Sequence, residues 1–465
     1  MMKKILCILL LFFTAPIYAA NLVEVYQQAI VSDPIYQQNI ATMLATKENV
    51  NISLSSLLPN IGASAQPYIS RTLSSGPATQ FNDSDRKRGY NVNLTITQTI
   101  FDYAQFANFA ESRSQAKQAS ATMNAAAQDL MIRVSHAYFQ ILEDEDILRA
   151  SESTKIAYGK QLDQIKEQYK VGIKTITDVY TAEASYESSV ADYIAADNTL
   201  QNDRENLRAI TGKLYTKLSR LSEKFPLIKP VPANVETWVD TATKQNWQVR
   251  AAQYGAVAAK QNIKQQFAGH FPTLNVEATY DINFVRDFGG QSNTFEEFPP
   301  GVGQSHVSTL SANLAVPIFE GGLVLAETRQ AKDNYQLSTQ KLEQQLRAAM
   351  NVTRQSYLGI IAGISKITAD RKAIQSSISS LEGMEAGYRV GTEILVNVLN
   401  QREQVLINQK QYAADRYAYV NNLLALKQAA GTLCPDDLAS INAWLFNKDD
   451  ELTPASSIAS QTNSQ

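Results

Sequence analysis

The side chains that most often do chemistry are sparse here and form no catalytic pattern. The three histidines, His136, His270 and His306, lack the spacing of metal ligands. The acidic run Glu143–Asp146 lies in a stretch of helix formers and predicts a solvated helix face, with a divalent-cation site as the alternative. The glycines within 289–303 follow a strand pattern but precede no helix, which argues against a phosphate loop. We find no nucleophile and base arrangement, and therefore expect no enzyme and no cofactor.

A Tyr-x-Val-Gly motif occurs twice and marks an internal duplication. It begins at Tyr169 and ends at Gly172, then returns from Tyr388 to Gly391, 219 positions later. The same offset relates two further pairs, Tyr138 with Tyr357 and Gly212 with Gly431. This distance is far beyond the 20 to 50 residues of a solenoid repeat. The sequence therefore predicts two copies of one structural half.

The N-terminus predicts export from the cytoplasm. Two lysines precede the apolar run Ile5–Phe13, and Ala19 offers a cleavage position, so residues 1–19 read as a secretory signal peptide. Cys7 would leave with it, and Cys434 would stay alone, which excludes a disulfide. Losing the two lysines takes the formal net charge from −3 to −5, with no basic patch for nucleic acid. No later apolar stretch approaches the about 20 residues of a membrane helix, so only strands could enter a membrane.

Four segments alternate between apolar and polar residues, as strands with one apolar face do. Their ranges are Ile61–Ile69, Tyr90–Thr97, Leu274–Phe284 and Leu310–Ile318. Each has about ten residues, the length of a tilted strand that crosses a membrane. The polar segments Arg71–Gly89 and Arg286–His306 are predicted to be long loops. An ordinary soluble sheet with one wet face is the alternative reading.

The remaining sequence predicts long helices. Prolines are absent from 78–225 and from 318–434, which are rich in strong helix formers. We expect a helix at about 22–57, a very long one at about 102–170, and a return helix at about 176–212 after Gly172. The second half should repeat this, with a return helix at about 395–431 after Gly391. Its long helix carries a coiled-coil seam: Tyr335, Thr339, Leu342, Leu346, Ala349, Thr353, Ile360, Ile364, Ile367, Ile374, Ile378, Leu381 and Tyr388.

The number of strands demands an oligomer if they enter a membrane. Four strands cannot close a barrel, and open edges are not tolerated in lipid. Two chains would give eight strands filled by side chains, and three would give twelve with room for a lumen. The strands and the Gly-marked tips should lie at opposite ends of a long rod, which suggests a conduit and favours three chains.

In combination these motifs resemble the TolC-type outer membrane efflux and secretion channels. The resemblance rests on the duplicated strand starts at Leu58-Pro59 and Phe271-Pro272, the Ile-Phe-Asp/Glu strand ends at 100–102 and 318–320, and the two tips. It covers residues 21–440. It implies a mixed α and β membrane protein: a homotrimer with coiled-coil hairpins that form a periplasmic tunnel, and four strands per chain in a shared twelve-stranded β-barrel. The implied regions are 20–212 (first repeat), 213–235 (equatorial linker), 236–431 (second repeat) and 432–446 (equatorial C-terminal segment), with 447–465 a disordered tail.

The resemblance also implies function and partners. The protein would be the passive exit duct of a tripartite efflux or type I protein secretion system, set in outer membrane lipid. A periplasmic membrane-fusion adaptor and an inner membrane pump, ABC or proton-driven, would be its partners. The rivals are a non-transporting trimeric stalk or adhesin, which needs only one helix per chain, and a secreted pore-forming toxin, which conductance after adding soluble protein would support.

The resemblance places the closed aperture at the helix tips. It implies closing ties through Thr177 and Asp178 on the first tip and Tyr388 on the second. This chain has Glu393 where the family has a basic residue, and Asn397 and Asn400 where it has carboxylates, so the family's Arg-to-Asp tie cannot form. Lys174 and Glu393 stand at equivalent repeat positions and could supply a new tie; tip residues that have simply drifted are the alternative. The predicted adaptor-docking positions are Lys170, Gly172, Arg389 and Gly391.

Overall fold

The computed structural model describes residues 19–74, 83–287 and 301–446. Nearly all of the predicted signal peptide, the predicted tail at 447–465 and the middle of both predicted loops lie outside the described residues. The chain divides into two compact units. Of the described residues, one unit comprises 19–40, 124–247 and 346–446, and the other comprises 41–74, 83–123, 248–287 and 301–345. Each unit is described by itself below.

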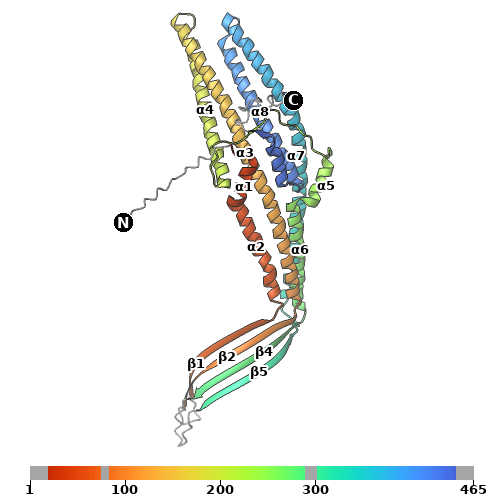
Figure 1. The fold of residues 1–465 in the computed structure, drawn as a ribbon. Helices are drawn as coiled ribbons and strands as arrows, with labels where there is room; N and C mark the ends of the chain where they lie inside the picture. Colours follow the sequence, from red (N-terminus) through yellow and green to blue (C-terminus); the bar gives the residue numbers. More distant parts are fainter. Residues whose placement is uncertain (1–18, 75–82, 288–300, 447–465) are drawn as a thin grey trace, which may run out of the picture. The chain divides into compact units, whose positions relative to one another are not determined.

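The second unit holds a four-stranded antiparallel sheet (Figure 1). Its order is β1 (Asn60–Ser74), β2 (Asp83–Phe101), β4 (Thr273–Asp287), β5 (Val302–Ala315). The strands are longer than the predicted ten residues and extend into the predicted loops, because ladder hydrogen bonds need backbone groups and not apolar side chains. β5 ends three residues before the predicted Ile318, since Pro317 cannot donate to a ladder.

The register of the sheet gathers the apolar residues on one face, as their alternation predicts. Tyr90 lies opposite Phe284, their rings stacked 5.1 Å apart, and Leu94 lies opposite Tyr280. On the other face Asn93 Nδ2 donates to Asp281 Oδ1 at 2.6 Å. Among the described residues, Ile61, Ile69 and Leu310 of this sheet are 67%, 79% and 77% exposed, and β5 is exposed along its whole length. A large apolar surface therefore remains open to a partner.

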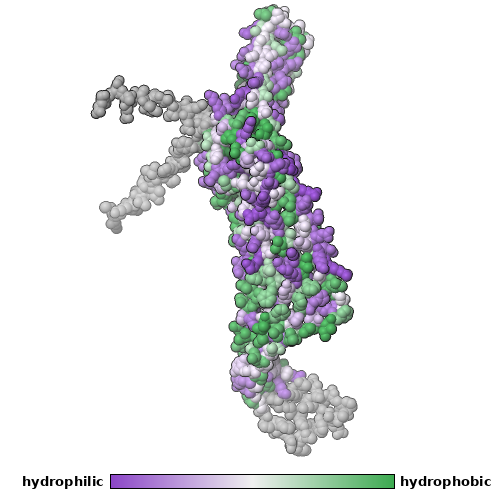
Figure 2. All heavy atoms as spheres, turned by 90° about the vertical axis from the view of Figure 1, so that its right-hand side faces the viewer, coloured by the Kyte–Doolittle hydropathy of each residue, from purple (hydrophilic) through white to green (hydrophobic). Residues whose placement is uncertain are grey.

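Hydrophobic residues also collect where the strands of this unit meet its helices (green in Figure 2). α6 (Trp247–Phe267) leads through a short 3₁₀ turn, η1 (Ala268–His270), into β4. Phe271 packs edge-on against Phe267 and Tyr103, with ring centroids 5.7 and 5.4 Å apart. Beyond β5, Ile318 and Phe319 are 94% and 86% exposed. These side chains extend the open apolar surface beyond the strands.

Four long helices form two hairpins whose tips belong to the first unit (Figure 1). α3 (Tyr103–Lys170) is followed by α4 (Ile176–Thr211), and α7 (Leu323–Val390) by α8 (Leu395–Ala429). These bounds match the predictions within a few residues. Along the predicted seam of α7, Thr353, Ile360 and Ile367 are buried. Ile378 is instead 37% exposed, and Ser377 is buried in its place.

The prediction of one helix over 22–57 is wrong. α1 (Leu22–Ser32) ends at an extended Asp33, and α2 (Pro34–Ser55) begins at the proline. A proline disfavours helical geometry in the residue before it. The Asp33 carboxylate accepts hydrogen bonds from Arg133 at 3.0 and 2.7 Å and from the backbone of Tyr36 at 2.8 Å. Burial opposes ionisation, but these donors outweigh it and lower the pKa of Asp33.

The second repeat has a matching break. α5 (Val235–Gln245) and α6 are separated by Asn246, whose Nδ2 donates to the Ala429 carbonyl at 2.9 Å. Gly431 follows α8 at φ +74°, and a Cβ there would lie 2.3 Å from the Gln245 carbonyl oxygen. Only glycine fits so close an approach. Both halves therefore pack a glycine-terminated return helix against a broken helix.

The predicted equatorial segments contact each other. β3 (Arg220–Leu221) pairs with β6 (Leu445–Phe446), which follows α9 (Pro435–Asn442). The Tyr138 hydroxyl, deep in the core, donates to the Ser219 carbonyl at 2.7 Å. The proposed domain bounds remain predictions. Across the described ranges, we find no helix with the length and apolar character needed to cross a membrane.

Candidate functional site

The first tip, between α3 and α4, is closed by a glycine and a capping box. Gly172 has φ +78°, which only glycine adopts without strain. Thr175 caps α4: its Oγ1 accepts from the Asp178 N–H at 3.2 Å, and Asp178 Oδ2 accepts from the Thr175 N–H and hydroxyl at 3.0 Å each. Asp178 thus stabilises its own turn, while Thr177 is exposed. A role of either residue in closing an aperture remains a prediction.

The second tip, between α7 and α8, is built differently. Gly391 has φ +86°, and the Gly387 carbonyl accepts from the backbone and hydroxyl of Thr392 at 2.9 and 3.2 Å. The N-cap of α8 is Ile394, which has no side-chain cap. Glu393 Oε2 instead accepts from Asn397 Nδ2 at 2.9 Å. The second tip therefore lacks the N-terminal capping that holds the first.

One cation links the two tips. Lys174 Nζ lies 4.3 Å from the ring centroid of Tyr388, a cation–π contact. The Tyr388 hydroxyl is buried and has no hydrogen-bond partner within the described part of the chain. An apolar cluster, which we call the tip cluster, packs beside it: Tyr158, Leu162, Ile165, Val179, Ala182, Leu395 and Leu399. This cluster joins α3, α4 and the start of α8.

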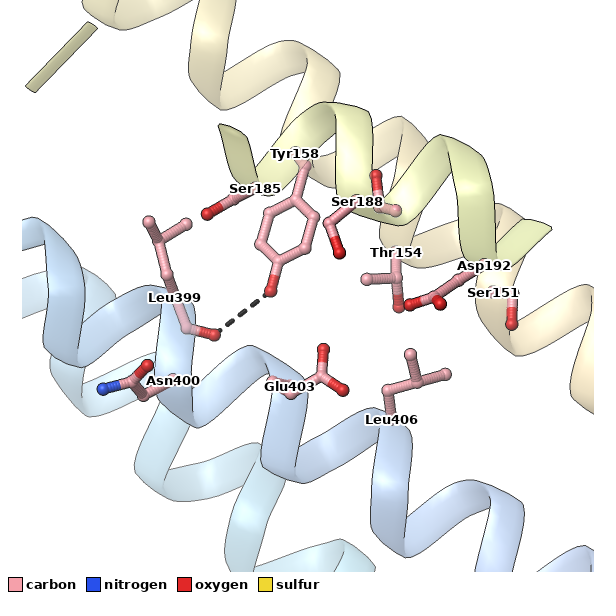
Figure 3. Close-up of a pocket in the computed structure, with 11 residues that line it drawn as sticks. Ser151, Thr154, Tyr158, Ser185, Ser188, Asp192, Leu399, Asn400, Glu403 and Leu406 are labelled. Atoms are coloured by element: carbon pink, nitrogen blue, oxygen red, sulfur yellow. Dashed lines mark hydrogen bonds between the residues drawn. The ribbon is translucent and has the colours of Figure 1, made fainter. Parts of the chain in front are cut away.

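Arg402 is a second link that sequence reasoning missed. Its guanidinium pairs with Glu385 of α7 and stands 5.7 Å from the ring centroid of Tyr158 of α3. The Tyr158 hydroxyl donates to the Leu399 carbonyl at 3.1 Å (Figure 3). Burial, reinforced by the carboxylate of Glu403, raises the pKa of Tyr158 to about 12, so the phenol stays neutral and remains a donor. The hairpins are thus joined by aromatic and cationic contacts.

The predicted Lys174–Glu393 pair does not form within this chain. Lys174 contacts Tyr388, and Glu393 contacts Asn397. A pair between neighbouring chains remains a prediction, because the two side chains are here seen in one chain only. Asn400 is exposed and lines a cavity between the hairpins. That Asn397 and Asn400 line an aperture also remains a prediction.

The outer surface of both tips is apolar as well as charged. Val171 and Ile173 are 70% and 69% exposed on the first tip, and Val390 and Ile394 are 77% and 63% exposed on the second. The predicted docking residues Lys170 and Arg389 are exposed beside them. Lys170 pairs with Glu167 at 2.7 Å, and Arg389 Nε donates to the Glu385 carbonyl at 3.3 Å. Each tip therefore offers small apolar patches flanked by a cation.

The prediction of a solvated face for Glu143–Asp146 is wrong. Asp144 is only 4% exposed. Glu145 pairs with Arg204 at 3.3 Å, and Asp146 accepts from the Tyr417 hydroxyl at 2.9 Å. α3 contacts α4 and α8 here, so the acidic run is buried or partly buried and is not a solvated face. Burial and a hydrogen bond to the carboxyl of Asp203 raise the pKa of Asp144 to about 7.

The remaining polar candidates are structural contacts. The His270 ring packs against Phe267, and His306 Nδ1 lies 3.0 Å from the Tyr280 hydroxyl. Within the residues that the structure describes, no group of three or more His, Cys, Asp or Glu side chains could hold a metal ion. The candidate functional site is therefore the pair of tips and the contacts that join them.

A family model described as "Outer membrane efflux protein" matches residues 25–213 and 238–432. The chain belongs to the outer membrane efflux protein family. The resemblance drawn from the tip and strand motifs is thereby confirmed, as is the outer membrane location. Outer membrane protein TolC of Escherichia coli (strain K12) is 33% identical over 453 residues, which cover 95% of this chain and 89% of that protein.

Two further similar proteins extend the comparison. The alkaline protease secretion protein AprF of Pseudomonas aeruginosa is 23% identical over 433 residues, 92% of this chain and 87% of AprF. The crystal structure of the CmeC outer membrane channel of Campylobacter jejuni has a TM-score of 0.75 at 17% identity, covering 92% of this chain and 90% of that one. The fold class is confirmed by this likeness. TolC is named as an outer membrane protein, AprF as a secretion protein and CmeC as an outer membrane channel, and the chain is an outer membrane exit duct.

Proposed function

We propose that three copies of this chain form the duct of a tripartite efflux or type I secretion machine. The observation that carries the trimer is the sheet. Its outer strands, β1 and β5, each have a strand partner on one side only within the described residues, and its apolar face is open. Three such sheets joined edge to edge would close a twelve-stranded barrel and present that face to lipid.

The tips support a periplasmic adaptor as the next partner. Both hairpins end in a left-handed glycine, and both expose apolar side chains beside a cation. Three chains would present six such tips, two kinds in alternation. An adaptor that docks there would couple the duct to an inner membrane pump, ABC or proton-driven. AprF and PrtF are named for protease secretion and BepC for outer membrane efflux, so relatives of this chain are named for both kinds of export.

Two measurements test this proposal. The detergent-extracted particle should have the mass of a trimer, and a monomer or dimer would remove the basis of the barrel. Cysteines at Lys170 and Arg389 should crosslink to an adaptor in cells. A cysteine at Lys229, an exposed lysine of the equatorial linker, is the matched control and should not. Equal crosslinking at all three positions would contradict tip docking.

The amides of the second tip give a test of the aperture. Carboxylate rings at a narrow entrance concentrate cations, so Asn397 and Asn400 should leave it weakly cation-selective. The Asn397→Asp/Asn400→Asp double variant should shift the bilayer reversal potential toward cation selectivity and gain block by trivalent cations. Unchanged selectivity and unchanged block would show that these residues do not line the constriction.

A further inference from the structure

A cavity of about 260 Å³ lies between α3, α4 and α8, beside the tip cluster (Figure 3). At about 30 Å³ per water, its volume corresponds to roughly eight or nine water molecules. Oxygen atoms dominate its lining. Ser151 and Thr154 come from α3, Ser188 and Asp192 from α4, and Asn400 and Glu403 from α8.

The two carboxylates of this cavity carry uncompensated charge. Asp192 and Glu403 line it from different helices, both are exposed to solvent, and both carboxylates raise the pKa of Tyr158. Neither has an ion-pair partner among the residues described by the structure; the neighbouring cation, Arg402, is bound to Glu385. The cavity therefore has two carboxylates that no ion pair among the described residues neutralises, which favours a cation from solvent.

A buried hydroxyl also lacks a partner there. Ser151 is 1% exposed, lines the cavity, and its Oγ has no hydrogen-bond partner within the described residues. Its neighbours are satisfied: Thr154 Oγ1 donates to the Ala150 carbonyl at 3.0 Å, and Ser189 Oγ donates to the Tyr186 carbonyl at 2.6 Å. Because buried polar groups in native proteins are nearly always paired, this hydroxyl indicates a ligand or an ordered water shell.

We propose that the cavity binds a hydrated divalent cation through Asp192 and Glu403. Mg²⁺ prefers oxygen ligands, usually keeps several waters, and is commonly held by one or two carboxylates. The space is too large for a bare ion, and the described residues offer no third ionisable ligand. The ion would keep its waters, to which Ser151 and Asn400 hydrogen-bond. It would brace α4 against α8, and so one hairpin against the other, a property separate from export.

Purified full-length protein in detergent tests this directly, with Mn²⁺ as the probe. Electron paramagnetic resonance measures free Mn²⁺, and Mg²⁺ should displace the bound ion. The Asp192→Asn/Glu403→Gln variant should bind Mn²⁺ about tenfold or more weakly, and Ser151→Ala a few-fold more weakly. The matched control is Glu187→Gln/Glu382→Gln, which removes two exposed carboxylates of α4 and α7 and should bind like the wild type.

Thermal unfolding provides a second readout that does not depend on the probe. Mg²⁺ should raise the unfolding midpoint of the wild type and of the control, but not that of the cavity variant, because a ligand stabilises only the state that binds it. Equal Mn²⁺ affinity in the cavity variant and the control would overturn the proposal. A second outcome would also overturn it. In that outcome a diamine such as putrescine binds the wild type and needs both carboxylates, while Mn²⁺ and Mg²⁺ bind the wild type no more tightly than they bind the cavity variant.

Discussion

Removing Arg402 should loosen the two hairpins. The side chain is 15% exposed and touches groups from two other helices, Glu385 of α7 and Tyr158 of α3. The Arg402–Glu385 ion pair contributes only about 0 to 1 kcal/mol to stability, because Glu385 is 39% exposed and water can solvate its carboxylate. The cation–π contact with the buried Tyr158 contributes about 1 to 2 kcal/mol. Arg402→Ala should therefore cost about 2 kcal/mol per chain, a shift of about thirty-fold in a two-state equilibrium.

The assay is the conductance of the purified oligomer in a planar bilayer. If the contacts of Arg402 hold the tips together, the alanine variant should spend a larger fraction of time in its high-conductance state. Arg402→Lys keeps a charge for Glu385 but loses the planar guanidinium over the ring, so it should lie between wild type and alanine. The matched control is Arg208→Ala, which removes a 53% exposed arginine paired within its own helix. Equal conductance of Arg402→Ala and Arg208→Ala would refute the reasoning.

Two predictions concern stability. Asp144→Asn should raise the unfolding midpoint at pH 8 but have little effect at pH 4. The pKa of Asp144 is about 7 in the folded state and 3.8 in the unfolded state. The protonated carboxyl therefore stabilises the folded state fully below about pH 4, and this stabilisation is lost as the pH rises from about 4 to 7. Gly431→Ala should destabilise by more than about 2 kcal/mol, since a Cβ would meet a backbone carbonyl and alanine is strained at φ +74°. Gly383→Ala is its control: it meets open space on α7 and should stabilise by about 0.5 to 1 kcal/mol.

Either result could go against the structure. If Asp144→Asn had the same effect at both pH values, the Asp144 carboxyl would not take up a proton on folding between about pH 4 and 7. Gly431→Ala and Gly383→Ala with effects of the same sign would show that the approach of the return helix to the helix break is looser than 2.3 Å implies.

The helices and tips could be predicted because their signals are local. Glycine at Gly172 and Gly391 allows the left-handed turn that ends each rod, and the proline-free stretches between are strong helix formers. The break at Asp33 was also signalled, by the proline that follows it, and was missed. The Thr175-x-x-Asp178 capping box can likewise be recognised in the sequence. It gives Asp178 a structural role in its own helix, besides the predicted role in closing the aperture.

The contacts between the hairpins could not be predicted. Arg402 meets Tyr158 although 244 positions separate them, and the meeting depends on how each helix is rotated about its axis. The prediction that the acidic run on α3 is solvated was wrong for the same reason. Whether Asp144 faces water or protein depends on the number of helices that surround it, which the four-residue acidic run does not encode.

The open sheet also bears on how the protein is made. A newly exported chain that folds as seen here carries two strand edges and an uncovered apolar face. Such a surface templates aggregation, and natural proteins normally protect it. The segments that the structure describes leave it open, so if three copies assemble as proposed, the interval between translocation and assembly is the period of greatest risk.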